Sequence, residues 1–303
     1  GTNERKSSIM KVTFIYAYEN EEWSTPMALA NEFESRDWEV DFVSIGSNRT
    51  GQYSDEQLQL WIQQDLECDI ALFMDWGRFD SKWLDKNLKS DTFWVQESGD
   101  DPQNFERNFP KSDRFDMTLS PDSDATNEYK NRGIASYWWT HFADTRVQFP
   151  MDIEPEYVGV TTRGTGNSEF LDTLTQHGGG TIGNKNGLDA KEHTEFLNKG
   201  LMVIQNSRWG EVTRRIFEGM ACGKLVLCDR LHENKKLHEL FIDGEDIVYY
   251  DDMIDCITKM NRYSEDNIER ERIAKNGYNK VLKNHTQKQR VDFILKKYKE
   301  WKN

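Results

Sequence analysis

Three charged residues in the second half of the chain lie at a spacing that brings them together on one helix. Arg214 and Arg215 precede Glu218 by four and three residues, so Glu218 is on the face shared with both. Guanidinium groups suit a diphosphate, because their planar forks donate two parallel hydrogen bonds to its oxygens. A carboxylate one turn further on can accept both hydroxyls of a ribose. The spacing therefore predicts a nucleotide site, with a plain ion pair between Arg214 and Glu218 as the alternative.

A strand, a short loop and a helix are expected to position this face. The strand ends near Asn206, the loop contains Gly210, and the helix begins near Val212. Free backbone N–H groups and the positive end of the helix dipole then face the crevice above the sheet, which favours phosphate binding. We therefore include Asn206 in the predicted nucleotide site.

A glycine-rich segment, Val158 to Gly166, leaves another predicted strand. Gly164 and Gly166 fit the first two positions of a GxGxxG dinucleotide fingerprint, but Glu169 occupies the third, so a Rossmann dehydrogenase is not expected. The glycines allow the backbone to approach a diphosphate closely. Arg163 and Gly164 are therefore predicted to contact the diphosphate, with a plain glycine turn as the alternative.

An acidic cluster follows a predicted strand in the first half of the chain. It contains Glu97, Asp100 and Asp101, and the ends of strands in open α/β sheets face the ligand crevice. A reaction that removes a proton from a substrate hydroxyl needs a base within hydrogen-bond reach. These three carboxylates are the first candidates for that base, with a solvated acidic turn as the alternative, and His141 and Asp144 are the second.

Apolar runs alternate with helical stretches along the whole chain, which is typical of an α/β fold with parallel strands. The first half predicts strands at Lys11–Tyr16, Glu39–Ile45, Ile70–Met74 and Phe93–Gln96, and helices at Met27–Glu34 and Asp55–Leu66. The second half predicts strands at Tyr157–Thr161, Met202–Gln205 and Leu225–Cys228, and helices at Ser168–Gln176 and Val212–Ala221.

The two series of elements are separated by the proline-punctuated segment Phe149–Pro155, which suits a linker. We therefore predict two Rossmann-like domains, over residues 1–150 and 151–285. The Lys-rich amphipathic segment 286–303 is predicted to be a helix that packs back across the domain junction.

Charge and cysteine usage exclude several classes of protein. The net charge is -14, and residues 1–150 hold 15 Lys and Arg against 28 Asp and Glu, which disfavours nucleic acid as a partner. No run of 18 apolar residues is present, so no membrane span is expected. The four cysteines include no CxxC pair, which argues against a structural metal and indicates the cytoplasm.

The string RRIFEGMACGKLVL, at residues 214–227, together with LHELFIDGEDIVYYDD, at residues 237–252, resembles the donor domain of group 1 glycosyltransferases. The resemblance is closest to the CgeB-like branch and extends from about Tyr157 to Arg290. It implies the GT-B fold, in which two Rossmann-like domains face each other across a cleft, here an acceptor domain over residues 1–150 and a donor-binding domain over residues 151–285. By position it also implies that Glu218 binds the donor ribose and that Arg214 or Arg215 holds the diphosphate.

One position departs from the pattern of many group 1 enzymes, which carry a second Glu eight residues before the ribose-binding one. Gly210 stands there in this chain, and Glu211 is one residue out of register. The CgeB-like branch commonly lacks that Glu, so the expected fold is unaffected. The departure removes the basis for expecting a retaining mechanism with a carboxylate at the donor sugar.

The function expected from these features is transfer of a hexose from a nucleoside-diphosphate sugar, such as a UDP-sugar, to a carbohydrate, small-molecule or protein hydroxyl. Neither a metal ion nor a cofactor is expected besides this co-substrate. One alternative is a metal-dependent GT-A transferase, for which Asp122 and Asp124 would form the Asp-x-Asp ligand pair. The other alternative is a sugar-nucleotide-binding protein without catalytic activity.

Overall fold

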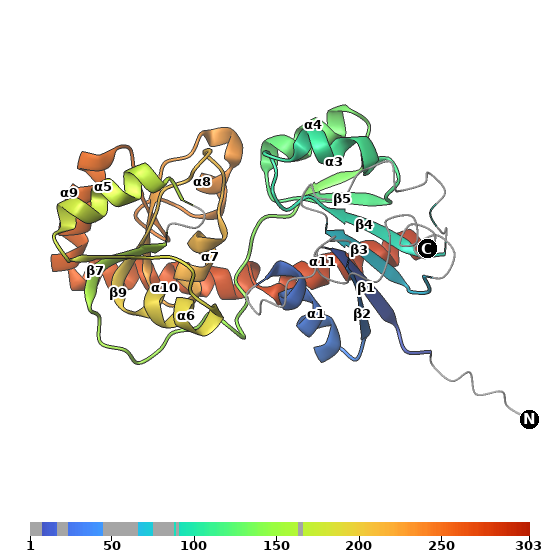
Figure 1. Ribbon diagram of the computed structural model, residues 1–303, viewed down its shortest axis with the longest axis horizontal. Helices are drawn as coiled ribbons and strands as arrows, with labels where there is room; N and C mark the ends of the chain where they lie inside the picture. Colours follow the sequence, from blue (N-terminus) through green and yellow to red (C-terminus); the bar gives the residue numbers. More distant parts are fainter. Residues whose placement is uncertain (1–7, 17–23, 45–65, 75–87, 89–90, 163–165) are drawn as a thin grey trace, which may run out of the picture. The chain divides into compact units, whose positions relative to one another are not determined.

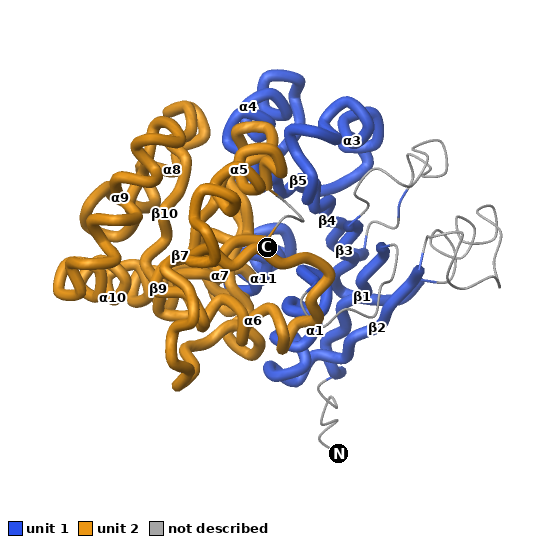
Figure 2. The backbone as a smooth tube through the Cα atoms, turned by 60° about the vertical axis from the view of Figure 1, so that its left-hand side comes forward, with its two compact units in different colours: residues 1–20, 24–139, 291–303 blue, residues 21–23, 140–290 orange. Residues whose placement is uncertain are grey.

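The computed structural model describes residues 8–16, 24–44, 66–74, 88, 91–162 and 166–303. These residues form two compact units (Figure 2). Unit 1 takes the described residues up to Trp139 and those from Val291 onward, and unit 2 takes Thr140 to Arg290. The predicted helix at Asp55–Leu66 falls, apart from Leu66, outside the described residues.

Unit 1 is built on a six-stranded sheet with the order β2-β1-β3-β4-β5-β6, and every neighbouring pair is parallel (Figure 1). The strands are β1 (Lys11–Tyr16), β2 (Glu39–Ser44), β3 (Ile70–Met74), β4 (Phe93–Glu97), β5 (Met117–Ser120) and β6 (Ser136–Trp138). The described helices that follow them are α1 (Thr25–Ser35), α3 (Phe105–Ser112) and α4 (Ser123–Asn131). The strands predicted at β1 and β3 are confirmed with the same bounds.

The last helix of the chain, α11 (Gln287–Lys302), runs into unit 1 from Val291 onward. Its Tyr298 and Trp301 rings lie 6.0 and 5.4 Å from the ring of Phe93, which begins β4. Arg36, at the end of α1, donates to the Asp292 carboxylate at 2.6 Å. Aromatic side chains of α11 therefore pack against unit 1, and Asp292 of the same helix forms an ion pair with Arg36.

Unit 2 is built on a five-stranded parallel sheet with the order β11-β10-β9-β7-β8. The strands are β7 (Tyr157–Thr162), β8 (Ile182–Lys185), β9 (Gly200–Gln205), β10 (Leu225–Asp229) and β11 (Val248–Tyr250). The helices are α5 (Ser168–Gly178), α6 (Ala190–Asn198), α7 (Arg214–Ala221), α8 (Leu237–Leu240), α9 (Met253–Glu265) and α10 (Asn267–Asn284), with a short 3-10 turn at Glu233–Lys235.

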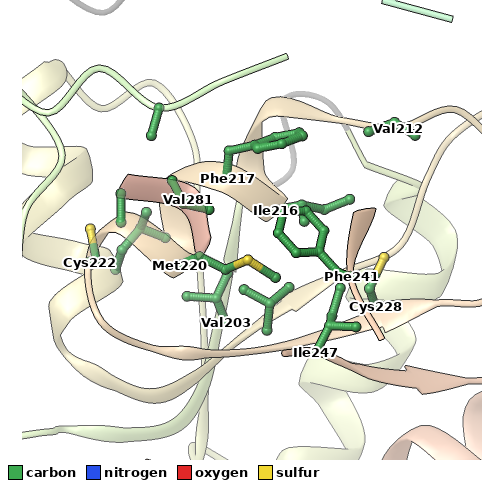
Figure 3. Packing of buried hydrophobic residues seen from close by; sticks show 14 of the residues in the cluster. Val203, Val212, Ile216, Phe217, Met220, Cys222, Cys228, Phe241, Ile247 and Val281 are labelled. Carbon is green, nitrogen blue, oxygen red and sulfur yellow. The ribbon is translucent and has the colours of Figure 1, made fainter. Parts of the chain in front are cut away.

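Both faces of the unit 2 sheet are covered, which is why its strands are almost continuously apolar. Residues of α6, α7 and α10 pack on one face and residues of α5, α9 and α10 on the other. Figure 3 shows Ile216, Phe217 and Met220 of α7 in the first of these clusters, with Val203 of β9. Because this face of α7 is anchored in the core, the position of its charged residues is fixed.

A glycine allows α7 to approach the sheet closely. A Cβ atom at Gly219 would lie 3.0 Å from Val226 and 3.1 Å from Val203, closer than side chains normally pack. The helix begins at Arg214 rather than at the predicted Val212, because Thr213 has an extended backbone with φ -112° and ψ 158°. Arg214 and Arg215 are therefore the first two helical residues, directly after the loop.

Candidate functional site

The predicted nucleotide site lies at the carboxyl edge of the unit 2 sheet, where β7 and β9 end side by side with Thr162 and Gln205. Arg215 reaches this edge from α7. Its Nη1 donates to Gln205 Oε1 and its Nη2 donates to Thr162 Oγ1, so the guanidinium group spans the ends of two neighbouring strands. A Cβ atom at Gly166 would lie 3.4 Å from Arg215 Nη1, so the backbone of Gly166 packs closely on this group.

Glu218 lies one turn further along α7 and is only 9% exposed. Its Oε1 is 3.5 Å from Arg214 Nε, and its Oε2 is 3.4 Å from Nδ1 of His193 on α6. The side chains of Arg214 and Glu218 are 18% and 12% exposed, so the pair is largely shielded from water. The predicted ion pair between Arg214 and Glu218 is therefore present, but it is not an exposed surface pair.

The two arginines diverge although both lie close to Glu218 in sequence. Arg215 points inward to the strand ends and is 4% exposed, whereas Arg214 lies nearer the surface. Burial lowers the pKa of Arg215 to about 10, and the Glu218 carboxylate acts in the opposite direction. Arg215 therefore keeps its charge at neutral pH.

Two histidines lie within electrostatic range of the arginines. Burial lowers the pKa of His193, with Glu218 opposing the shift and both arginines adding to it. Burial also lowers the pKa of His141 to about 3, and the positive charge of Arg214 contributes. Both imidazoles are therefore neutral near pH 7, so neither adds positive charge beside the two guanidinium groups. Two guanidinium groups in the first turn of a helix suit an anionic ligand at this edge.

Asn206 is part of the framework of this edge. Its side-chain amide donates to the Tyr250 hydroxyl at 3.0 Å, and that hydroxyl donates to the Gln205 carbonyl at 2.6 Å. The Asn206 carbonyl accepts from the backbone of Asn167, the N-cap residue of α5, at 3.0 Å. These bonds tie the ends of β9 and β11 to the start of α5.

Arg163 and Gly164, which were predicted to contact the diphosphate, lie outside the described residues.

The acidic cluster of unit 1 contains carboxylates in different environments. Glu97 is the last residue of β4 and is 5% exposed, Asp101 is equally buried, and Asp100 is exposed. Asp101 Oδ2 accepts a hydrogen bond from Ser120 Oγ at 2.8 Å. Burial raises the pKa of Asp101 to about 6, although hydrogen bonds from Ser98 and Ser120 oppose the shift. The solvated acidic turn expected as the alternative describes Asp100 but not Asp101.

The remaining candidates from the sequence have structural roles. Asp122 is the N-cap residue of α4, and its carboxylate accepts from the backbone of Ala125 at 2.9 Å. Asp144 is fully buried and accepts from Arg146 Nη2 at 2.6 Å. Within the described ranges, no group of three or more His, Cys, Asp or Glu side chains could hold a metal ion. No helix in the described part of the chain has the length and apolar character needed to cross a membrane.

His193 is the member of the site that sequence reasoning missed. It belongs to no motif and lies 25 residues before Glu218, on a different helix. Only the packing of α6 and α7 on the same face of the sheet brings the two side chains together. The capping signal Asp189 to Glu192 marks the start of α6, but it gives no indication of what His193 contacts.

Part of the amino-acid sequence matches a known protein family, and nearly the whole chain is similar in structure to solved proteins. Residues 163–296 match the family described as glycosyl transferase-like. No curated protein matches the chain in sequence. Sucrose-phosphate synthase from Thermosynechococcus elongatus is similar in structure, with a TM-score of 0.69 and 10% identity over 96% of this chain and 98% of that chain.

Two further solved structures have the same architecture. Anabaena Alr3699/HepE in complex with UDP-glucose has a TM-score of 0.66 and 12% identity, over 95% of this chain and 100% of that chain. A glycosyltransferase from Rickettsia africae has a TM-score of 0.65 and 10% identity, over 97% of this chain and 99% of that chain. The chain therefore has the predicted GT-B fold, with two Rossmann-like domains built on parallel sheets.

Proposed function

We propose that the chain is a glycosyltransferase of the GT-B type that transfers a hexose from a nucleoside-diphosphate sugar to a hydroxyl acceptor. The observation that carries the proposal is that Arg214 and Arg215 begin α7 at the carboxyl edge of a parallel sheet, with the Glu218 carboxylate one turn further on. Ligands of open α/β sheets bind at this edge, where two guanidinium groups and the start of a helix favour an anion. The glycosyl transferase-like match of residues 163–296 supports the same conclusion.

The donor proposed for this site is a UDP-sugar, because HepE, which shares the fold, has been solved with UDP and with UDP-glucose. In the proposed complex the Glu218 carboxylate accepts hydrogen bonds from the ribose hydroxyls. Arg214, which lies nearer the surface, donates to the diphosphate. Arg215 holds the strand ends in place and adds positive charge behind them.

The proposed reaction is independent of metal ions and of any further cofactor. As the bond between the sugar and the diphosphate breaks, negative charge builds up on the departing UDP. Fixed guanidinium groups and the N–H groups that begin α7 stabilise this charge without reorganising. This is the role that a divalent cation plays in a metal-dependent transferase.

The acceptor hydroxyl has to lose a proton as it attacks the sugar. Glu97, Asp100 and Asp101 remain the proposed bases, and they belong to unit 1. Asp101 is the leading choice among them, because burial raises its pKa to about 6. A base is most effective when its pKa lies near the working pH.

The acceptor proposed is a carbohydrate, small-molecule or protein hydroxyl rather than a polyphosphate. Residues 1–150 hold 15 basic against 28 acidic side chains, so the first half of the chain repels a polyanion at neutral pH. Similarity to the CgeB-like branch, stated above from the sequence, is part of the same proposal.

A second candidate function is donor binding without transfer. It is favoured by Gly210, which stands where many group 1 enzymes carry a carboxylate, and by the position of the neighbouring Glu211. The Glu211 carboxylate accepts from the backbone of Trp209 at 2.7 Å and is thus engaged within its own loop. A protein of this kind would bind UDP-sugars and form no product.

A turnover assay separates these functions. The purified chain is incubated with UDP-, GDP- and ADP-hexoses and a panel of acceptors, with and without EDTA, and glycosylated product is detected by mass spectrometry. Product formation that persists in EDTA is the expected result. Binding of UDP-sugar without any product would support the second candidate, and activity that requires added Mn²⁺ would refute metal independence.

A further inference from the structure

Unit 2 contains a second candidate binding site at the opposite edge of its sheet. A cavity of about 380 Å³ lies where β9 and β10 begin, lined by Leu201, Gly223 and Lys224 and by Arg270, Lys275 and Tyr278 of α10. Gln205 marks the other end of β9, five residues from Gly200. At about 3.3 Å per residue, roughly 17 Å separates this cavity from the nucleotide site. The two sites are therefore distinct.

The cavity has an excess of positive charge. Three cations, Lys224, Arg270 and Lys275, line it together with one carboxylate, that of Glu271. Arg270 is 8% exposed, and its Nη1 donates to the backbone carbonyls of Tyr263 and Ser264 at 2.7 and 3.4 Å. No carboxylate among the described residues forms an ion pair with any of the three cations.

Such an arrangement of charges is unfavourable for Arg270, the buried member of the group. A buried cation is normally paired with a carboxylate, because transfer of a charge out of water is costly. Burial lowers the pKa of Lys224, and the nearby Arg270 lowers it further. The two groups are thus close enough to repel each other, and an anion between them would relieve both the repulsion and the loss of hydration.

The shape of the cavity leaves room for such a ligand. Arg270, Ala274 and Tyr278 follow one another at intervals of four residues, so they lie on one face of α10, with the small alanine between the two polar groups. Gly223 has a left-handed backbone, with φ at +74°, and a Cβ atom there would lie 3.4 Å from the ring of Pro150. This tight turn directly precedes Lys224 and fixes where its side chain begins.

We propose that this cavity binds a small phosphorylated metabolite, at a site separate from that of the sugar-nucleotide donor. A phosphate ester carries a charge of about -1.5 to -2 near pH 7, which balances an excess of two cations. The planar fork of Arg270 and the two ammonium groups suit its three oxygens. The volume is at the lower end of the range for small-molecule pockets, roughly 300 to 1,000 Å³, and fits a ligand smaller than a sugar nucleotide.

Calorimetry with inorganic pyrophosphate at constant ionic strength tests the proposal. The test variant is the double substitution Lys224→Gln and Lys275→Gln, which spares the structural bonds of Arg270. It is expected to weaken pyrophosphate binding about tenfold or more, because two charge-assisted contacts are lost. Lys191→Gln is the matched control, since Lys191 is an 82% exposed lysine on α6 outside the cavity.

Glu271→Gln provides a test that a folding defect cannot imitate. Removal of the one lining carboxylate should strengthen pyrophosphate binding several-fold. Arg214→Gln distinguishes the two sites, because it should leave this binding event unchanged even if the donor site also takes up pyrophosphate.

Wild-type affinity in the double variant, or no binding of pyrophosphate by the wild-type chain, would overturn the proposal. Loss of binding in Arg214→Gln alone would also overturn it, since the ligand would then occupy the nucleotide site. Failure of the proposed transferase activity would leave all of these measurements unaffected.

Discussion

Replacement of Glu218 by glutamine distinguishes the proposed donor site from a structural ion pair. The substitution keeps the shape of the side chain and removes the negative charge that pairs with Arg214 and raises the pKa of Arg215. The alternative offered by the sequence is a plain ion pair on the helix surface, and loss of such an exposed pair would cost less than about 1 kcal/mol of stability. The structure corrects this expectation, because the side chains of Arg214 and Glu218 are only 18% and 12% exposed.

The expected losses follow from this burial. A cation left without its partner in a shielded position costs about 1 to 3 kcal/mol in the free energy of unfolding. A measurement of stability therefore does not distinguish a donor site from a structural ion pair, because both predict a loss. A measurement of ligand affinity does distinguish them. Loss of a hydrogen bond from a ribose hydroxyl to a charged group costs roughly 1.5 to 3 kcal/mol. Each 1.4 kcal/mol is a factor of ten, so the Kd for UDP should rise by about 10- to 100-fold.

The assay is calorimetric titration of UDP and of uridine into the wild-type and Glu218→Gln chains. Both ligands contain the ribose, so both should lose affinity by a similar factor. Glu195→Gln is the matched control, because Glu195 also faces a cation four residues away, Lys191, but lies outside the site. Wild-type affinity of Glu218→Gln for both ligands would refute the assignment of Glu218 to the ribose and most of the case for a donor site.

Three further predictions concern other parts of the molecule. Arg214→Gln should weaken UDP binding about tenfold and uridine binding far less, because only UDP carries the diphosphate; equal losses by calorimetry would contradict this. The pKa of Asp101 is raised to about 6, so the folded chain binds a proton more tightly than the unfolded chain, and stability should fall by roughly 3 kcal/mol as the pH rises from about 4 to 7. Urea unfolding of Asp101→Asn should lack this slope. Gly219→Ala should destabilise unit 2 by about 1 to 3 kcal/mol in thermal unfolding, because the new Cβ atom would lie 3.0 Å from Val226.

The fold could be predicted from the sequence wherever an element is long and apolar. The predicted strands Lys11–Tyr16 and Ile70–Met74 are β1 and β3, since buried parallel strands form continuous apolar runs. The strands β5, β6, β8 and β11 were not predicted. Each has only three or four residues, too few for a periodic pattern, and is defined by pairing with a neighbouring strand.

The site could be predicted only as far as helix geometry reaches. The spacing of Arg214, Arg215 and Glu218 correctly places the three residues on one helix. It does not distinguish the arginine that points inward from the one nearer the surface, because both lie within a turn of Glu218. That difference depends on Gln205 and Thr162, which accept from Arg215 at the ends of two strands.

The environments of the acidic residues could not be predicted from the sequence either. Their carboxylates are close together in sequence but lie in different surroundings. Asp100 is exposed and Asp101 is 5% exposed, although they are adjacent. Composition cannot distinguish them, since the pKa of a carboxylate depends on burial and on hydrogen bonds to groups such as Ser120, 19 residues away. Asp101 combines a position after a parallel strand with burial that raises its pKa to about 6. Such a combination is typical of groups that exchange protons during a reaction, and it is the physical reason to test Asp101 first as the acceptor base.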